Sequence, residues 1–186
     1  MMPVTAVEHP RVLLALSAHG YGHLAQCAPV INALTSEMPG LQLSVCSTLP
    51  EPVIANRINT PFELHCVELD PVLQMHSAWE VDAAASQQVY RAFHDGWEAG
   101  LQHDRQLLRE LNPDVVLADI PYRILLAAGQ LGITSVGLCS LNWAAIYSAY
   151  CEGDENDTDM LAQMLSGYRA ADVFLMPQPA MAMPEL

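Results

Sequence analysis

Short apolar runs alternate with longer segments of helical periodicity along most of the chain. The apolar runs have the length of buried strands, and the longer segments repeat their apolar residues at the three- and four-residue spacing of helices. Strands separated by helices form βαβ units, and these build a parallel sheet that is covered on both faces. The pattern therefore predicts an α/β fold, a doubly wound Rossmann-like parallel sheet with helices on both faces.

The boundaries of the expected elements follow from this pattern and from its stop signals. Glycine and proline end several segments, at Pro39-Gly40, Asn112-Pro113 and Gly132. The expected strands are Arg11–Leu16, Leu41–Ser47, Phe62–Glu68, Val115–Ala118, Thr134–Cys139 and Val173–Met176. The expected helices are Leu24–Met38, Pro52–Ile58, Tyr122–Leu131, Asn142–Tyr150, Thr158–Ala170 and a long stretch over Val81–Leu111 that breaks near Gly96 or Gly100.

The length of 186 residues suits one well-buried domain and is too short for two ordinary ones. We expect this domain to occupy residues 1–176. The segment Pro177–Leu186 is rich in proline, methionine and alanine, so it forms no regular element and yet is apolar. It is interpreted as the start of an interdomain linker, with the domain that would follow absent from this chain.

The charge balance excludes several classes of partner. The formal net charge is −14, and the seven basic residues are all arginine. Nucleic acids require a basic surface that displaces counterions, and binding to anionic lipid requires basic patches, so neither partner is expected. A neutral or cationic substrate is favoured, and any phosphate would be held by helix N-termini or by another domain. No apolar run has membrane-spanning length, and the residues Met1–Glu8 have neither the basic nor the apolar region of a signal peptide. No integral membrane segment, no signal peptide and a cytoplasmic location are therefore expected.

The cysteines carry no recognisable metal or disulfide pattern. Their number is odd, no Cys-x-x-Cys occurs, and no Cys/His cluster has the spacing of zinc ligands. Several lie within apolar segments, where cysteine behaves as a small hydrophobic residue. We expect all five to be reduced and structural, namely Cys27, Cys46, Cys66, Cys139 and Cys151.

The loop between the first strand and the first helix is the main candidate for chemistry. It consists of Ser17–His23 and contains Gly20 and Gly22, which permit a close approach of ligand and backbone. In a doubly wound sheet, ligands bind beside such loops at the carboxyl ends of the strands. The dinucleotide fingerprint fails because Ala25 stands where it requires glycine, and a Walker A loop fails because the chain contains no lysine.

Two histidines in this loop, His19 and His23, suggest acid–base catalysis. Asp119 follows a short apolar strand, so its carboxylate is expected at the same edge of the sheet, where it could orient an imidazole. Alternatively, His19 or His23 caps the end of the strand through hydrogen bonds to the backbone, and Asp119 caps the helix near Tyr122. A metal site on the two histidines is disfavoured because the intervening glycines oppose a helix. Ser140 and nearby Asn142 follow another strand and are candidates for ligand contact.

The segment Ser17-Ala-His-Gly-Tyr-Gly-His23, followed by a helix, resembles the first loop of GT-B glycosyltransferases. It is most similar to a bacterial subgroup with the signature His-Gly-x-Gly-His-x-x-Arg. The resemblance continues through Pro113-Asp-Val-Val-Leu-Ala-Asp119 and the strands that follow, although these later matches are generic to the fold. It identifies residues 1–176 as the N-terminal, acceptor-side domain of a two-domain glycosyltransferase.

This resemblance implies roles for the loop residues and for partners. His23 would be the catalytic base that deprotonates an acceptor hydroxyl, and Asp119 would orient it. The other residues of the site would contact substrate: His19, Gly20, Tyr21, Gly22, Ser140 and Asn142. The sugar would come from a nucleotide-sugar donor and pass to a neutral or hydrophobic acceptor without a metal or other cofactor. A C-terminal domain would hold the donor, so the chain alone would be inactive, and Gln26 stands where the signature has arginine.

Two other functions stay open. The same architecture serves sugar-nucleotide epimerases, and a non-catalytic sugar-binding or regulatory module is a further alternative. Among the weaker signals, Asp157-Thr158-Asp159 is expected to belong to a solvated acidic loop that leads into a helix. His76, His94 and His103 are expected in surface or capping roles. Trp79 and Trp97 are expected either in the core or as the lining of an acceptor pocket.

Overall fold

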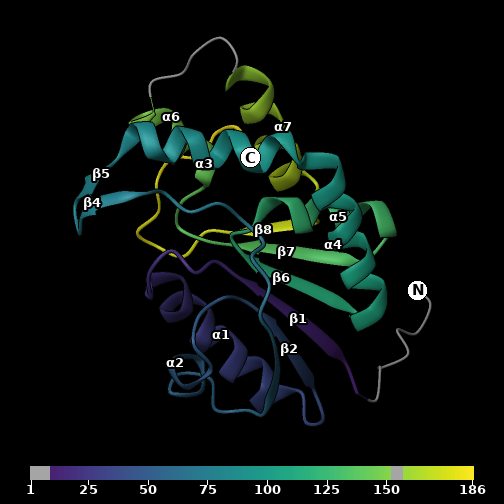
Figure 1. The fold of residues 1–186 in the computed structure, drawn as a ribbon. Helices are drawn as coiled ribbons and strands as arrows, with labels where there is room; N and C mark the ends of the chain where they lie inside the picture. The colour runs from purple at the N-terminus through teal and green to yellow at the C-terminus, as the bar shows by residue number, and fades with distance from the viewer. Residues whose placement is uncertain (1–8, 152–156) are drawn as a thin grey trace.

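The computed structural model describes residues 9–151 and 157–186. Six parallel strands form one sheet in the order β3-β2-β1-β6-β7-β8 (Figure 1). Their bounds are β1 Arg11–Leu16, β2 Gln42–Cys46, β3 Phe62–His65, β6 Val115–Asp119, β7 Thr134–Leu138 and β8 Val173–Leu175. The predicted fold class is therefore confirmed, and each predicted strand is present with bounds shifted by up to three residues.

Helices cover both faces of this sheet, as Figure 1 shows, and each face has its own apolar core. The helices α1 (Gly22–Glu37) and α2 (Glu51–Ala55) pack on one face. The opposite face carries α3 (Ala83–Asp95), α4 (Trp97–Leu111), α5 (Tyr122–Leu131), α6 (Trp143–Tyr150) and α7 (Asp157–Arg169). Because successive residues of a strand point to opposite faces, β1 divides between the cores, with Leu13 in one and Leu14 in the other.

The order of the strands creates a switch point between β1 and β6. The chain proceeds from β1 outward through β2 and β3, then returns to add β6, β7 and β8 on the other side of β1. In the register of the pair, Leu16 lies opposite Asp119, so both strands end at the same level. The Ser17 backbone N–H donates to the Asp119 carbonyl oxygen at 2.8 Å and fixes the start of the loop after β1. In doubly wound sheets this position is where ligands bind.

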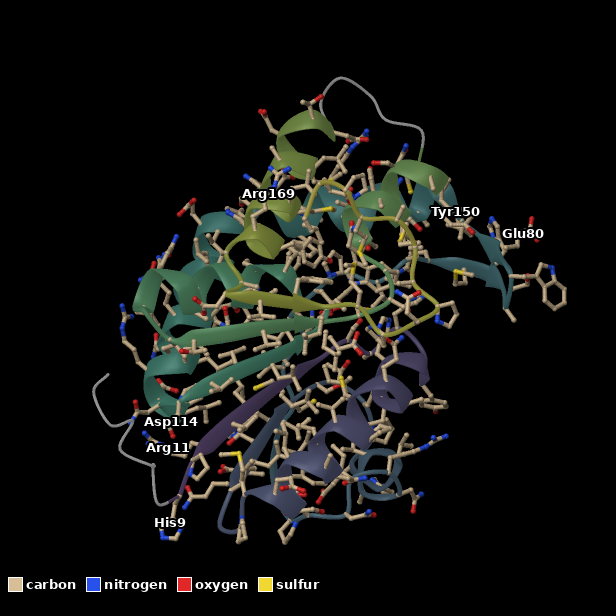
Figure 2. The ribbon with its side chains drawn as sticks, turned by 180° about the vertical axis from the view of Figure 1, so that it is seen from behind. His9, Arg11, Glu80, Asp114, Tyr150 and Arg169 are labelled. Carbon is tan, nitrogen blue, oxygen red and sulfur yellow. The ribbon has the colours of Figure 1, made fainter. Side chains whose placement is uncertain are left out.

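The long helical stretch is divided, as expected, at Gly96. Asp82 caps the first half by accepting from the Ala85 backbone N–H, and Asn112 ends the second half in the left-handed conformation at a φ of 45°. The pattern missed a small antiparallel hairpin, β4 (Met75–Ser77) with β5 (Glu80–Val81), before α3. Glu80 marks this hairpin in Figure 2, where it projects away from the sheet, at the opposite side from Arg11 and Asp114.

The last ten residues fold back on the domain. The Met181 backbone N–H donates to the Ser140 carbonyl oxygen, and the Glu185 carboxylate accepts from Asn142 Nδ2 at 2.8 Å. Met183 is buried, so part of the apolar character of this segment is explained by packing on the same domain. Within the described ranges 9–151 and 157–186, no helix is both long enough and apolar enough to cross a membrane.

Candidate active site

The loop after β1 begins at Ser17 and ends where α1 starts. Gly20 adopts a φ of +75°, which L side chains rarely adopt, whereas Gly22 is already the first residue of α1. The loop is tightened by the Gly20 backbone N–H, which donates to the Ala18 carbonyl oxygen at 2.9 Å. The turn therefore requires glycine at one of the two positions, and it directs the first turn of α1 toward the end of β6.

His23 and Asp119 are brought together by this geometry. His23 lies in the first turn of α1 and Asp119 is the last residue of β6, pointing to the α1 face of the sheet like Leu117 two residues earlier. His23 Nδ1 lies 2.9 Å from Asp119 Oδ1, and both side chains are buried. When Nδ1–H donates to the carboxylate, the lone pair of the ring is on Nε2 and can accept a proton.

The structure rejects the alternative role of Asp119 as a helix cap. Helix α5 starts at Tyr122 with Pro121 in the capping position, and no side chain caps it. The second carboxylate oxygen, Oδ2, instead accepts from the Cys27 thiol at 3.2 Å. Burial, followed by the negative charge of Asp119, raises the pKa of Cys27 well above its usual value, so this thiol stays protonated and donates.

His19 lies beside His23 but has a different partner. Its ring meets the buried indole of Trp143 edge to face, with centroids 5.2 Å apart, and the His23 ring lies 5.6 Å from the same indole. Burial, and then the nearby charge of His23, lowers the pKa of His19, so its ring is neutral at pH 7. Its backbone N–H points to the Ser17 hydroxyl oxygen at 3.4 Å, as expected for a residue that shapes the loop.

Trp143 is itself held by residues from distant parts of the chain. Its indole Nε1–H donates to the Asp70 carboxylate at 2.7 Å, and its backbone N–H donates to the Tyr168 hydroxyl at 3.0 Å. Burial raises the pKa of Asp70 to about 6 even though the hydrogen bond from Trp143 opposes the shift. Asp70 and Trp143 thus support both loop histidines. The sequence did not predict this pair. Its one signal was Asp70 directly after the apolar Leu69 in the segment that follows β3.

Ser140 and Asn142 behave differently from each other. The Ser140 hydroxyl accepts from Gln26 Nε2 at 3.3 Å, and its backbone N–H donates to Gln26 Oε1 at 3.2 Å. Gln26 therefore links α1 to the loop after β7 at the edge where the candidate site lies. Asn142 is fully buried and caps α6 by accepting from the Ala145 backbone N–H, so both polar atoms of its side chain are used within the domain.

The tryptophan alternatives resolve as one core residue and one surface residue. Trp97 is buried, and its ring stacks on that of His94 with the ring centroids 5.1 Å apart, so it packs in the core. Trp79 is 87% exposed on the β4–β5 hairpin. The expected surface or capping role of His94 is wrong, because its ring bonds to Gln163 and Tyr122. His76 and His103 are exposed, as expected.

The acidic tripeptide is also corrected. Asp157 is buried at the start of α7, where it binds the Arg91 guanidinium at 3.0 Å and the Tyr147 hydroxyl at 3.0 Å. A solvated position is thus wrong for this residue, because its carboxylate neutralises a cation and orders the packing of α6. The rest of the expected acidic loop, residues 152–156, lies outside the described residues.

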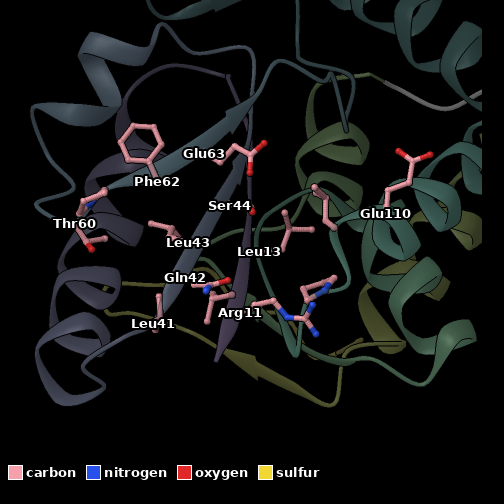
Figure 3. A pocket seen from close by; sticks show the side chains of 14 residues that line it. Arg11, Leu13, Leu41, Gln42, Leu43, Ser44, Thr60, Phe62, Glu63 and Glu110 are labelled. Atoms are coloured by element: carbon pink, nitrogen blue, oxygen red, sulfur yellow. The ribbon is translucent and has the colours of Figure 1, made fainter. Parts of the chain in front are cut away.

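Two cavities border the sheet at opposite ends of its strands. The larger, of about 650 Å³, is lined by the first residues of β1, β2 and β3, including Arg11, Gln42 and Glu63 (Figure 3). The smaller, of about 180 Å³, lies at the carboxyl ends and is lined by Ala18, Asp70 and others. Ligands of doubly wound sheets bind at the carboxyl ends, so the smaller cavity lies at the same end of the sheet as the candidate site, although neither His23 nor Asp119 lines it.

The free cysteines include two that border this site. All five are free, and Cys66 alone among them is exposed. Cys139, which follows β7, places its sulfur 3.9 Å from His23 Nδ1, and the sulfur of Cys27 lies 3.2 Å from Asp119 Oδ2. The site therefore combines a buried carboxylate, an imidazole and two thiols. Such a set can hold a proton in a defined place and can also ligate a metal.

The sequence matches no known family model and no curated protein. Solved structures do share the fold. A UGT of Glycyrrhiza uralensis, complexed with glycyrrhetinic acid 3-O-monoglucuronide, has a TM-score of 0.54 at 13% identity over 91% of this chain and 44% of its own. The calicheamicin glycosyltransferase CalG4 has a TM-score of 0.51 at 17% identity, over 84% and 41%. The UDP-GlcNAc 2-epimerase of Methanocaldococcus jannaschii has a TM-score of 0.50 at 11% identity, over 90% and 39%.

These similarities establish the architecture. The chain has the fold of a GT-B N-terminal-like domain, as the resemblance of its first loop predicted. It spans about two fifths of the length of the solved chains that it matches.

Proposed function

We propose that this chain is the acceptor-binding and base-supplying domain of a glycosyltransferase that moves a sugar from a nucleotide-sugar donor to an acceptor hydroxyl. The observation that carries the proposal is the buried contact of 2.9 Å between His23 Nδ1 and Asp119 Oδ1 at the switch point of the sheet. The GT-B-type fold adds support, because glycosyltransferases are among the proteins that share it.

The proposed reaction needs a base whose tautomer is fixed. Asp119 holds the proton of the neutral ring on Nδ1, so Nε2 is the nitrogen that removes the proton of the acceptor hydroxyl as its oxygen attacks the anomeric carbon. The imidazolium that forms is stabilised by the same carboxylate, which follows the logic of a catalytic triad. No metal takes part in this proposal. General base catalysis of this kind contributes about 10²–10⁴-fold in rate.

The contacts of the other loop residues suggest where the acceptor lies. We propose that His19, Gly20, Tyr21 and Gly22, which directly precede His23, contact the acceptor; Tyr21 is exposed. The Ser140 hydroxyl, already paired with Gln26, is available to a ligand at the same edge. A neutral or hydrophobic acceptor suits a protein of net charge −14 in which, among the described residues, no arginine pairs with His23 or Asp119. We propose that a second domain, outside this chain, binds most of the nucleotide.

The test is transfer by the longest protein that contains this chain, measured with UDP-sugars and a panel of hydroxyl acceptors. Wild type is expected to transfer sugar, and His23→Ala is expected to lose about 10²–10⁴-fold in kcat while it still binds the acceptor. His19→Ala is the matched control, because it removes a neighbouring imidazole that takes no part in the proposed proton transfer. Equal rates in wild type and His23→Ala would refute the assigned base.

An epimerase is the second candidate, and the position of Asp70 favours it. This buried carboxyl has a pKa of about 6, lies beside the histidines through Trp143 and lines the cavity at the carboxyl ends of the strands. A carboxyl with such a pKa can exchange a proton with a sugar near neutral pH. Epimerisation of a UDP-sugar without any acceptor, lost in Asp70→Asn, would support this candidate over transfer.

A further inference from the structure

The atoms around the candidate base also form a set of metal ligands. His23, Asp119 and Cys139 each offer one donor atom, and these three atoms lie within 4.8 Å of one another. The individual contacts are 2.9 Å from His23 Nδ1 to the carboxylate and 3.9 Å from His23 Nδ1 to Cys139 Sγ. All three side chains are buried.

These separations are close to those of a tetrahedral zinc site. With Zn–N and Zn–O bonds of about 2.1 Å and a Zn–S bond of about 2.3 Å, neighbouring ligand atoms lie about 3.4–3.6 Å apart. The carboxylate would move away from the ring by about half an ångström, and the sulfur would approach it by less. A nitrogen, an oxygen and a thiolate sulfur suit Zn²⁺ and Co²⁺, whereas Mg²⁺ and Ca²⁺ prefer oxygen alone.

The electrostatics of Asp119 give a second reason for a cation here. Its carboxylate is fully buried, and its side-chain partners among the described residues are an imidazole and the thiols of Cys27 and Cys139, not an arginine. A buried anion without a cationic partner is costly. A divalent ion bound by one carboxylate, one thiolate and one neutral imidazole would make the cluster electrically neutral.

We propose that His23, Asp119 and Cys139 bind one thiophilic divalent cation, and that its binding blocks the base assigned above. The metal site stands on the geometry and on the buried charge of Asp119, and the block of the base rests on the proposed function. Binding of M²⁺ releases the Cys139 thiol proton to solvent and moves the ring proton of His23 from Nδ1 to Nε2. The charge balances because one proton leaves and a thiolate forms. An Nε2 that carries a proton cannot accept one from a hydroxyl, so metal and base catalysis exclude each other.

Cys27 has a distinct place in this proposal. Its thiol donates to the other carboxylate oxygen of Asp119 at 3.2 Å, so it orients a ligand without being one of the three donors. Replacement of such an outer partner weakens metal binding by about 10–100-fold. Cys66, which is exposed, has no place in the site and provides the matched control.

The test is a titration of the reduced 186-residue chain with Co²⁺, followed by displacement with Zn²⁺. A thiolate-to-cobalt charge-transfer band is expected at one Co²⁺ per chain, with release of about one proton for each ion bound. The band should disappear in Cys139→Ser and His23→Gln, weaken in Cys27→Ser and persist in Cys66→Ser. Far-ultraviolet circular dichroism checks that each variant is folded. Two ligand variants are used so that the test still holds if one of them does not fold.

The outcomes separate this inference from the proposed function. No charge-transfer band in wild type, or a band that survives in Cys139→Ser, refutes the metal site whatever the enzyme does. If the band behaves as expected and transfer is found, the ratio of rates with and without Zn²⁺ is compared within each variant. Inhibition of wild type that is relieved in Cys139→Ser supports the blocked base, and equal inhibition in both refutes it. A band without any transfer activity refutes the proposed function and leaves the metal site standing.

Discussion

His94 makes the stability of the packing between α3, α5 and α7 depend on pH. Its Nδ1 lies 2.7 Å from Gln163 Oε1, and its Nε2 lies 2.9 Å from the Tyr122 hydroxyl. The neutral ring satisfies both partners, since Nδ1–H donates to the amide oxygen and Nε2 accepts from the hydroxyl. Burial, opposed by the hydrogen bond to Gln163, lowers the pKa of His94 from 6.5 to about 4. The folded protein therefore holds this ring neutral where the unfolded chain would protonate it.

The stability that His94 contributes is complete above pH 6.5 and is lost as pH falls toward 4. In this interval the unfolded chain binds a proton that the folded protein does not, so acid favours unfolding. One pKa unit corresponds to about 1.4 kcal/mol. Between about pH 7.5 and about pH 4.5, the free energy of unfolding should fall by about 2.5 kcal/mol because of this residue.

Asp70 has the opposite effect over nearly the same interval. Its pKa is raised by burial from 3.8 to about 6, so the folded protein takes up a proton before the unfolded chain does. Its contribution stabilises the fold as pH falls through 6 toward 3.8. From about pH 7.5 to about pH 4.5 this amounts to about 2 kcal/mol. In wild type the two contributions nearly cancel.

Urea unfolding followed by circular dichroism at the two pH values separates them. Relative to wild type, the change in unfolding free energy on going to about pH 4.5 should be about 2.5 kcal/mol more favourable in His94→Gln. In Asp70→Asn it should be about 2 kcal/mol less favourable. Packing lost in either variant lowers the free energy of unfolding by the same amount at both pH values, so it cancels in this comparison. The same pH dependence in His94→Gln as in wild type would refute the assignment of a neutral, half-buried His94.

Three further predictions concern the site and its support. Asp119→Asn should lower the rate of sugar transfer by about 10²–10⁴-fold, because the amide neither fixes the tautomer of His23 nor stabilises its cation; unchanged kcat in a transfer assay contradicts this. In Gly100→Ala the new methyl group would lie 2.2 Å from the buried Arg123 guanidinium, so the unfolding free energy should fall by about 1–3 kcal/mol. Gly96→Ala meets ordinary contacts and is the control. Cobalt binding through the Cys139 thiolate, set out above, is the third.

The sheet was predictable because its central strands, β1 and β6, are apolar on both faces and its helices keep one period over many residues. Arg11–Leu16 and Val115–Ala118 were found from composition alone, because a parallel strand that is buried on both faces reads as a continuous apolar run. The β4–β5 hairpin was missed for the converse reason. Its strands have three and two residues, carry exposed His76 and Glu80, and lack the length that a pattern needs.

The candidate site was predictable where it depended on the ends of neighbouring strands. His23 and Asp119 could be paired because parallel strands bring their carboxyl ends to one edge. The support from Trp143 and Asp70 could not be foreseen, since it depends on which way a loop turns after β3. His94 was misassigned for a related reason. A histidine on an amphipathic helix has no sequence mark that separates a surface position from one covered by α5 and α7.

The switch point also dictates when the site comes into existence. His23 and Asp119 are separated by 96 positions in the chain, and the residues between them build the strands β2 and β3 and the helices α2, α3 and α4. Contacts of such long range form late in folding, because the entropy of closing the intervening chain must be met first. On a ribosome, β1 and its loop would leave the exit tunnel long before β6 does. A nascent chain would therefore display His23 without its carboxylate, and the base would be completed only when β6 docks beside β1.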